Sequence, residues 1–188
     1  MINLIGHDNE INFINKNLLN NNLHNSILVH GPKGIGKRKF INKLITNIFT
    51  HKNINNIEHH LNLFSKSSHP NIRVLEREID TKAKKLKTYI TIEQIRNIKT
   101  FVNETSSISD FPKIVIVDSA DDFNINSSNS FLKTLEEPNN NTFIFLISHQ
   151  LSSLLPTIRS RCIKIKLNSL IYENFKKVLI NNIDNIEE

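Results

Sequence analysis

The sequence predicts an α/β domain of three layers, with helices on both faces of a mostly parallel sheet of five strands. Two observations lead to this fold class. Short apolar runs alternate along the chain with segments whose apolar residues recur every three or four positions, which is the spacing of one helix face. A helix that joins two parallel strands must cross over the sheet, so helices come to lie on its faces. The expected strands are residues 27–29, 70–75, 113–118, 142–148 and 163–167.

The composition excludes several kinds of site and partner. The chain has 188 residues, enough for one well-buried domain, and its single cysteine, Cys162, excludes an internal disulfide and a multi-cysteine zinc site. We therefore expect a reducing, cytoplasmic environment. No apolar run approaches the length of a membrane span, so no membrane association is expected. A net charge of +6 is compatible with nucleic acid or an acidic partner and proves neither.

A glycine-rich turn, Gly-Pro-Lys-Gly-Ile-Gly-Lys-Arg, follows the first apolar run. Gly31, Gly34 and Gly36 permit a loop whose backbone N–H groups turn inward, and Lys37 adds a positive charge, so the turn fits a phosphate-binding loop. The last position departs from the motif, because Arg38 stands where a Ser or Thr hydroxyl would hold Mg²⁺. We expect phosphate or ATP to bind here without hydrolysis. The alternative is an ordinary glycine turn between a strand and a helix.

Five segments carry the period of a helix. Thr91 and Gln94 form the pattern of a capping box at the start of one, a helix over 127–137 is ended by Pro138, and the last helix begins at Ser169. The apolar residues that define these helices are Ile11, Ile14, Leu18 and Leu19; Phe40, Ile41, Leu44, Ile45 and Ile48; Ile92, Ile95, Ile98 and Val102; Phe131, Leu132 and Leu135; and Leu170, Ile171, Phe175, Val178 and Leu179.

Two polar stretches lie between these segments. Residues 51–69 contain four histidines, but His59 and His60 are sequential and no cysteine or well-spaced acidic residue joins them, so no metal site is predicted. Residues 82–87 are basic without interleaved aromatic side chains, which predicts a solvated loop. The alternative for this basic segment is contact with a nucleic-acid backbone.

The third expected strand ends in a carboxylate, Asp118. In a parallel sheet this residue lies at the same edge as the phosphate-binding loop, where it can hold Mg²⁺ or its water. The next position, which would carry the water-activating glutamate of an ATPase, is Ser119. Two parts of a hydrolytic site are therefore missing, and Asp118 serves either metal binding or the ordering of a nearby loop.

Alternation in the last expected strand predicts its place in the sheet. Ile163, Ile165 and Leu167 share one face, whereas Lys164 and Lys166 share the other. A strand with one wet face is half-buried or lies at an edge of the sheet.

Two longer motifs resemble one family. They are Phe-Leu-Lys-Thr-Leu-Glu-Glu-Pro at residues 131–138 and Leu-Pro-Thr-Ile-Arg-Ser-Arg-Cys at residues 155–162. Together they resemble the clamp-loader branch of the AAA+ ATPases, and within it the chain is most similar to the delta-prime subunits of bacterial DNA polymerase III. That family commonly carries a four-cysteine zinc module, which this chain lacks, so no zinc is carried over. Supporting motifs are His24-Asn25, Ser68-His69-Pro70-Asn71 and Ile92-x-x-Ile95-Arg96.

The resemblance implies a division into domains and a function. Residues 1–168 would form an AAA+ phosphate-loop domain, and residues 169–188 would begin a helical lid domain, with the rest of the lid and the family's collar domain absent. The chain would be a non-hydrolysing clamp-loader subunit, without activity of its own, in the DNA-directed DNA polymerase III holoenzyme, a nucleotidyltransferase. Its partners would be the gamma or tau and delta subunits and, through the complex, the sliding clamp and primed DNA.

The resemblance also gives Arg161 a catalytic role in trans. In the Ser-Arg-Cys turn it would enter the ATP site of a neighbouring subunit as an arginine finger, while the glycines, Lys37 and Asp118 would form a degenerate nucleotide site. Considered by itself, Arg161 could instead pair with a carboxylate of its own domain. Two alternatives for the whole chain are an ATP-hydrolysing subunit that resembles gamma or tau, and a stand-alone nucleotide-binding module.

Overall fold

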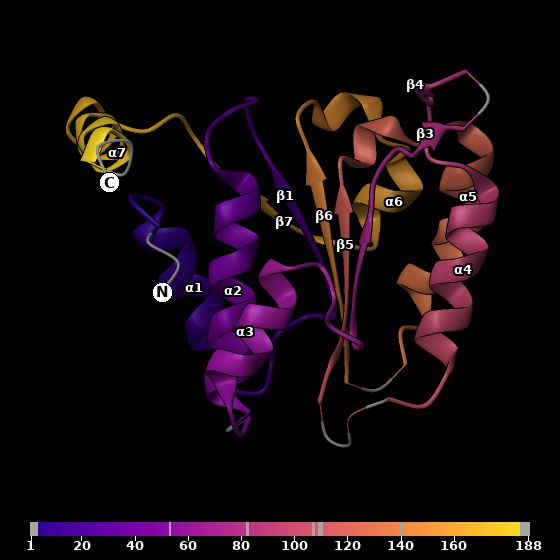
Figure 1. Cartoon of the computed structure of the whole chain (residues 1–188), viewed down its shortest axis with the longest axis horizontal. Helices are drawn as coiled ribbons and strands as arrows, with labels where there is room; N and C mark the ends of the chain where they lie inside the picture. The colour runs from indigo at the N-terminus through magenta and orange to yellow at the C-terminus, as the bar shows by residue number, and fades with distance from the viewer. Residues whose placement is uncertain are drawn as a thin grey trace.

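The structure, a computed structural model, describes residues 4–52, 54–81, 83–106, 108, 111–139 and 141–184. Its centre is a five-stranded sheet in which every neighbouring pair of strands is parallel, in the order β2-β5-β6-β1-β7. Helices cover both faces of the sheet, as Figure 1 shows, and the expected three-layer α/β fold is confirmed. The strands are β1 (Ser26–His30), β2 (Ile72–Leu75), β5 (Lys113–Asp118), β6 (Thr142–Ser148) and β7 (Ile163–Lys166).

The central strands are buried on both faces, and their alternating side chains feed two separate cores. In β6, Phe143, Phe145 and Ile147 pack toward one layer of helices, whereas Ile144 and Leu146 pack toward the other. Each such side chain stabilises the fold by about 1.5–3 kcal/mol on burial. The first layer contains α1 (Asp8–Leu19), α2 (Lys37–His51) and α3 (Ile57–Ser65), and the second contains α4 (Ile92–Asn103), α5 (Ile125–Glu136) and α6 (Pro156–Ser160).

Side-chain caps define where two helices of the second layer begin. Thr91 and Gln94 form the predicted capping box of α4. Asn124 and Ser127 form a second capping box, so α5 begins at Ile125, two positions before the predicted start. The predicted buried face of α4 is wrong at Ile92, the first residue of the helix, which is 36% exposed, and Phe101 joins that face near the other end.

The edge strand has the predicted environment. β7 pairs with β1 alone within the described chain, and Ile165 is buried while Lys164 and Lys166 are exposed. Ile163, the first residue of β7, is 38% exposed, so the predicted alternation of buried and exposed side chains fails at this position.

Several polar stretches adopt structure that the sequence pattern did not predict. α3 lies within the histidine-containing stretch, and β3 (Ile79–Asp80) pairs with β4 (Lys85–Leu86) as a short antiparallel hairpin at the basic segment. Lys82, part of that segment, lies outside the described residues. Two 3₁₀ turns, η1 (Ala120–Asp122) and η2 (Leu151–Ser153), follow β5 and β6.

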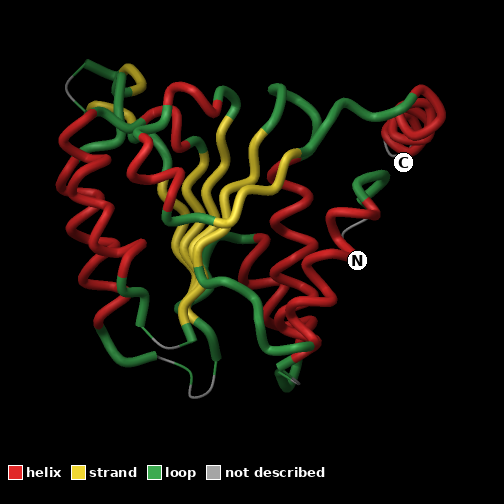
Figure 2. The backbone as a smooth tube through the Cα atoms, turned by 180° about the vertical axis from the view of Figure 1, so that it is seen from behind, coloured by secondary structure: helices red, strands yellow, loops and turns green. Residues whose placement is uncertain are grey.

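The last helix, α7 (Tyr172–Asp184), begins three residues after the predicted start and stands apart from the three layers (Figures 1 and 2). Its apolar side chains are largely uncovered: Phe175, Leu179 and Ile180 are each about half exposed. No helix in the described residues is long and apolar enough to cross a membrane.

Candidate functional site

The glycine-rich loop joins the end of β1 to the start of α2, at the edge of the sheet where the parallel strands have their carboxyl ends. Lys37, the first residue of α2, is 4% exposed, and its Nζ donates hydrogen bonds to the carbonyl oxygens of Gly31 at 2.6 Å and Pro32 at 2.5 Å. Burial lowers the pKa of Lys37, and the negative charges of Asp121 and Asp118 oppose that shift. The loop thus folds over a buried cation that lies near two carboxylates.

The loop glycines have two different physical roles. A Cβ at Gly31 would lie 2.1 Å from the carbonyl oxygen of Leu167, so only glycine permits this close approach to the chain that leaves β7. Gly34 and Gly36 have φ angles of +85° and +90°, and a Cβ at either would meet no atom within 4 Å. These two glycines provide the left-handed turns of a loop that is open on its outer side, as a phosphate-binding loop requires.

Arg38 pairs with Asp118, the carboxylate that the sequence predicted as a candidate ligand of Mg²⁺. Its Nη1 forms an ion pair with Asp118 Oδ2 at 2.8 Å, and its Nε donates a hydrogen bond to Asn42 at 3.3 Å. Asp118 lies at the carboxyl end of β5, as predicted, but its pairing with Arg38 was not predicted. The glycines and Lys37 fit a phosphate group. The Arg38–Asp118 pair does not fit Mg²⁺, because a guanidinium replaces the hydroxyl ligand and neutralises the carboxylate.

Asp121, in η1, organises the loop beside this site. Its carboxylate accepts hydrogen bonds from the backbone N–H groups of His149 (2.6 Å) and Gln150 (3.1 Å) and from the hydroxyls of Ser148 and Ser153. Burial by itself would raise the pKa of Asp121, but these hydrogen bonds outweigh it, and the pKa lies below its usual value. The role of Asp121 was not predicted from the sequence. The only local signal was a second carboxylate shortly after the strand that ends in Asp118.

Arg161 lies near the amino ends of the parallel strands, whereas the glycine-rich loop lies at their carboxyl ends. It immediately follows α6 and precedes β7, whose first residue, Ile163, is level with Ile27 of β1. Arg161 shares a pocket with Asn25, which is six positions before Gly31, and strands rise about 3.3 Å per residue, so roughly 20 Å separates Arg161 from the loop that follows β1. The structure therefore brings the glycines, Lys37 and Asp118 together and leaves Arg161 away from them.

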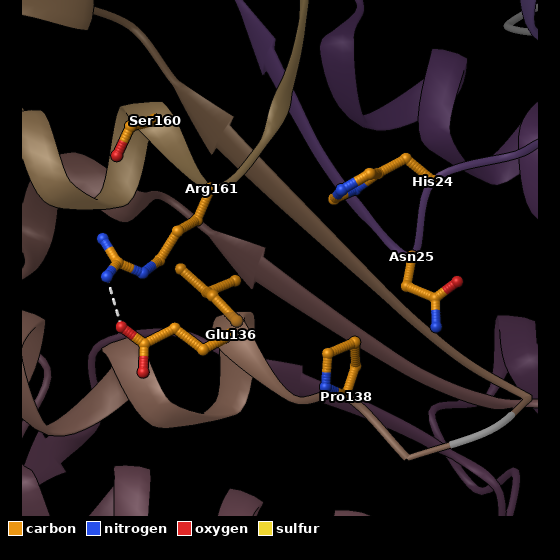
Figure 3. Close-up of a pocket in the computed structure, with 7 residues that line it drawn as sticks. His24, Asn25, Glu136, Pro138, Ser160 and Arg161 are labelled. Atoms are coloured by element: carbon orange, nitrogen blue, oxygen red, sulfur yellow. Dashed lines mark ion pairs between the residues drawn. The ribbon is translucent and has the colours of Figure 1, made fainter.

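The guanidinium of Arg161 is held by groups of its own domain. Nη1 donates a hydrogen bond to the carbonyl oxygen of Thr157 at 2.9 Å, and Nη2 forms an ion pair with Glu136 (Figure 3). The two side chains lie at a pocket of about 550 Å³ that His24, Asn25, Pro138 and Ser160 also line. In the chain alone, Arg161 thus pairs with Glu136, a carboxylate of its own domain, which is the alternative that the sequence left open.

Two histidines of the polar stretch pack against each other. His60 Nδ1 lies 3.0 Å from His69 Nε2, and the ring of His69 packs against Phe111. Within the part of the chain that the structure describes, no group of three metal-binding side chains is found here or elsewhere.

Comparisons with known proteins agree with this architecture. A family model described as "DNA polymerase III, delta subunit" matches residues 6–171. The chain is 35% identical over 141 residues to DNA polymerase III subunit delta′ of Pseudomonas aeruginosa, which covers 73% of this chain and 41% of that protein. It is 28% identical over 169 residues to DNA polymerase III subunit gamma of Buchnera aphidicola subsp. Schizaphis graminum, 86% of this chain and 45% of that protein.

A solved structure shows the same fold at low identity. The RuvB Holliday junction branch migration motor of Thermotoga maritima matches with a TM-score of 0.62 and 14% identity, over 97% of this chain and 52% of that protein. At this identity the likeness shows the AAA+ fold and nothing more. The chain spans less than half the length of the two curated relatives, 41% and 45%.

Proposed function

The chain belongs to the DNA polymerase III delta-subunit family, and from this premise we propose that it is a non-hydrolysing subunit of a clamp loader. In this role it acts in the cytoplasm with gamma or tau and delta subunits. Through that complex it helps to place a sliding clamp on primed DNA. Residues 1–168 supply the AAA+ domain, and residues 169–188 begin the lid domain.

One observation carries the non-hydrolysing assignment: the ion pair between Arg38 and Asp118 at 2.8 Å. Phosphoryl transfer in phosphate-loop proteins depends on a metal ion held by a hydroxyl and a carboxylate, and on a residue that orients the attacking water. Arg38 replaces the hydroxyl and engages the carboxylate, and Ser119 stands at the water-orienting position. The loop retains the glycines and the lysine that bind a phosphate group, so ATP or phosphate binds as a structural ligand and is not hydrolysed.

The position of Arg161 supports a role in a neighbouring subunit. It lies at the sheet edge opposite its own phosphate-binding loop and therefore has no access to a nucleotide bound there. An arginine finger supplied in trans stabilises the charge that develops on the transferred phosphoryl group, typically by about 10³ to 10⁵ in rate. We assign Arg161 this role in the ATP site of the adjacent motor subunit.

The second candidate is a motor subunit that hydrolyses ATP, and the match to a gamma subunit over 86% of the chain favours it. The residues at positions 38 and 119 weigh against this candidate. A stand-alone nucleotide-binding module is the third candidate, and it would bind ATP without affinity for other loader subunits.

The test combines the isolated chain with a reconstituted loader. The isolated chain is expected to show no ATP hydrolysis above background. In the loader assembled with its gamma and delta subunits, Arg161→Ala should lower ATP hydrolysis and clamp loading strongly, and Arg161→Lys less so, because lysine lacks the planar fork. Arg159→Ala, a change of the same kind two positions earlier, is the matched control. Normal rates in the Arg161→Ala complex would show that Arg161 is structural, and turnover by the isolated chain near 1 s⁻¹, within the range of ordinary kinases, would support the gamma-like role.

A further inference from the structure

Two acceptors from different helices fix the guanidinium of Arg161 (Figure 3). Glu136, the last residue of α5, pairs with Nη2, and the carbonyl of Thr157, within α6, accepts a hydrogen bond from Nη1 at 2.9 Å. Glu136 therefore reaches Arg161 across the boundary between two elements. The side chains of Arg161 and Glu136 are 31% and 42% exposed, so the pair lies at the surface, where another molecule can meet it.

The stem of Arg161 is fixed as well. Ile158 and Cys162, on either side in the chain, are 0% and 7% exposed and anchor the backbone in the core. Arg161 Nε is buried and has no hydrogen-bond partner among the described residues. The backbone of Arg161 is thus anchored in the core, its Nε is enclosed, and its two Nη atoms are held by Glu136 and Thr157.

The remaining hydrogen-bond donors suit a phosphoryl group. Each Nη atom of an arginine carries two N–H groups. Glu136 and Thr157 each engage one Nη, so among the described residues each Nη keeps one N–H group without a partner. Two N–H groups in the plane of one guanidinium match two oxygens of a phosphate.

We propose that Glu136 is a positioning residue, which orients Arg161 so that its two unused Nη N–H groups face the phosphoryl group of a neighbouring subunit's ATP. This inference rests on the role in trans proposed above for Arg161. An arginine that is already oriented loses less conformational freedom when it meets its ligand, and small errors in position cost large factors in rate. In this role Glu136 supplies a hydrogen-bond acceptor for Arg161 Nη2. A neutral side chain of the same shape with an acceptor oxygen should therefore orient Arg161 as well.

The experiment measures ATP hydrolysis by the reconstituted loader with five variants of this chain, of which Arg161→Ala is one. Glu136→Ala should lower kcat about tenfold at the site that Arg161 faces and leave KM unchanged, because misplaced groups affect the transition state more than binding. Glu136→Gln, which keeps the acceptor oxygen, should restore at least half of the rate. Glu137→Ala is the matched control, since Glu137 is exposed and forms no ion pair within the described chain. In the double variant Glu136→Ala/Arg161→Ala, the first change should add nothing to the second.

The outcomes separate this inference from the proposed function. A normal rate with Glu136→Ala beside a low rate with Arg161→Ala would overturn the positioning role alone. A loss that adds to that of Arg161→Ala, or that Glu136→Gln does not repair, would also overturn it. A normal rate with Arg161→Ala would overturn both the role in trans and the positioning that depends on it.

Discussion

Arg38 is the residue that most changes the chemistry of the glycine-rich loop. An ion pair of two side chains that are each about one-third exposed contributes only about 0–1 kcal/mol to stability. Its importance is therefore electrostatic and local, because the carboxylate at the end of β5 is already paired with a cation. A divalent ion that approached Asp118 would have to displace the guanidinium and would meet its positive charge.

We predict that Arg38→Thr makes this site respond to magnesium. The change removes the guanidinium from Asp118 and restores a hydroxyl, so Mg²⁺ together with ATP should raise the Tm of the variant more than that of the wild type. Thermal unfolding with ATP, in Mg²⁺ and in EDTA, measures this difference. Lys39→Thr removes the same charge from the neighbouring exposed position and serves as the control. Equal magnesium responses in the wild type and in Arg38→Thr would contradict the prediction.

At the scale of elements, α5 runs between the end of the sheet that carries the glycine-rich loop and the end that carries Arg161. It begins directly after η1, whose Asp121 ties the chain that follows β6 beside the glycine-rich loop, and it ends at Glu136, which holds Arg161. The capping box of Asn124 and Ser127 satisfies N–H groups at the first turn of α5. The helix thus runs from the neighbourhood of Asp121 to Glu136, the partner of Arg161.

We predict that Asp121→Asn destabilises the domain by about 2–3 kcal/mol at pH 7, since hydrogen bonds to a charged group contribute about 1.5–3 kcal/mol. The pKa of Asp121 is lowered in the folded state, so its contribution is present above its ordinary pKa of 3.8 and is lost as the pH falls through the lower folded value. Urea unfolding should therefore show a gap between wild type and variant that persists from pH 7 to about pH 4 and narrows below it.

Asp122→Asn is the matched control for this measurement. Asp122 pairs with Arg77 at 3.1 Å near the surface, and such pairs contribute about 0–1 kcal/mol. A loss for Asp122→Asn as large as that for Asp121→Asn would show that the hydrogen bonds of Asp121 are not the cause.

At the scale of the whole molecule, the first helical layer is joined to the sheet through a buried histidine. His69 is 1% exposed, its ring stacks on Phe49, and its Nδ1 accepts a hydrogen bond from the backbone N–H of Asn71 at 3.1 Å. Burial, together with the smaller effect of the positive charges of His60, His59 and Arg73, lowers the pKa of His69 to about 4. The layer packs around a neutral imidazole.

We predict that this histidine makes the stability of the fold fall in mild acid. The unfolded chain binds a proton at His69 near pH 6.5, whereas the folded chain does so only near pH 4, so stability should decrease as the pH falls between these values. His69→Asn, which keeps an acceptor near Nδ1, should be less stable at pH 7.5 and lose less stability on acidification. Denaturant unfolding from pH 7.5 to 4.5 measures this slope.

Burial also lowers the pKa values of His30, His60 and His149, so His69→Asn should remove only part of the slope. The matched control is His51→Asn, at the end of α2 and outside the packed group of His69, Phe49 and His60. This variant should keep the wild-type dependence of stability on pH. An unchanged slope in His69→Asn would show that His69 is not a source of the acid sensitivity.

Local patterns in the sequence predicted most of the fold and the outline of the site. The apolar runs predicted all five strands of the sheet, the pattern Thr91-x-x-Gln94 predicted a capping box, and the glycine spacing predicted the loop. These features depend on residues a few positions apart, because burial on two faces, helix capping and left-handed turns leave a periodic or short-range signal. The departures from the hydrolytic motifs at Arg38 and Ser119 could be predicted for the same reason, since each lies within a short motif.

Only the tertiary structure decided which charged side chains meet. Arg38 pairs with Asp118 across 80 positions, and Asp121 binds groups that lie 27 to 32 positions away. Glu136 meets Arg161 because α5 and α6 pack side by side on one face of the sheet. An ion pair needs only two side chains within reach, and it imposes no period on the sequence between them. The order of the strands and the packing of the helices determine these contacts, and therefore the chemistry of both edges of the domain.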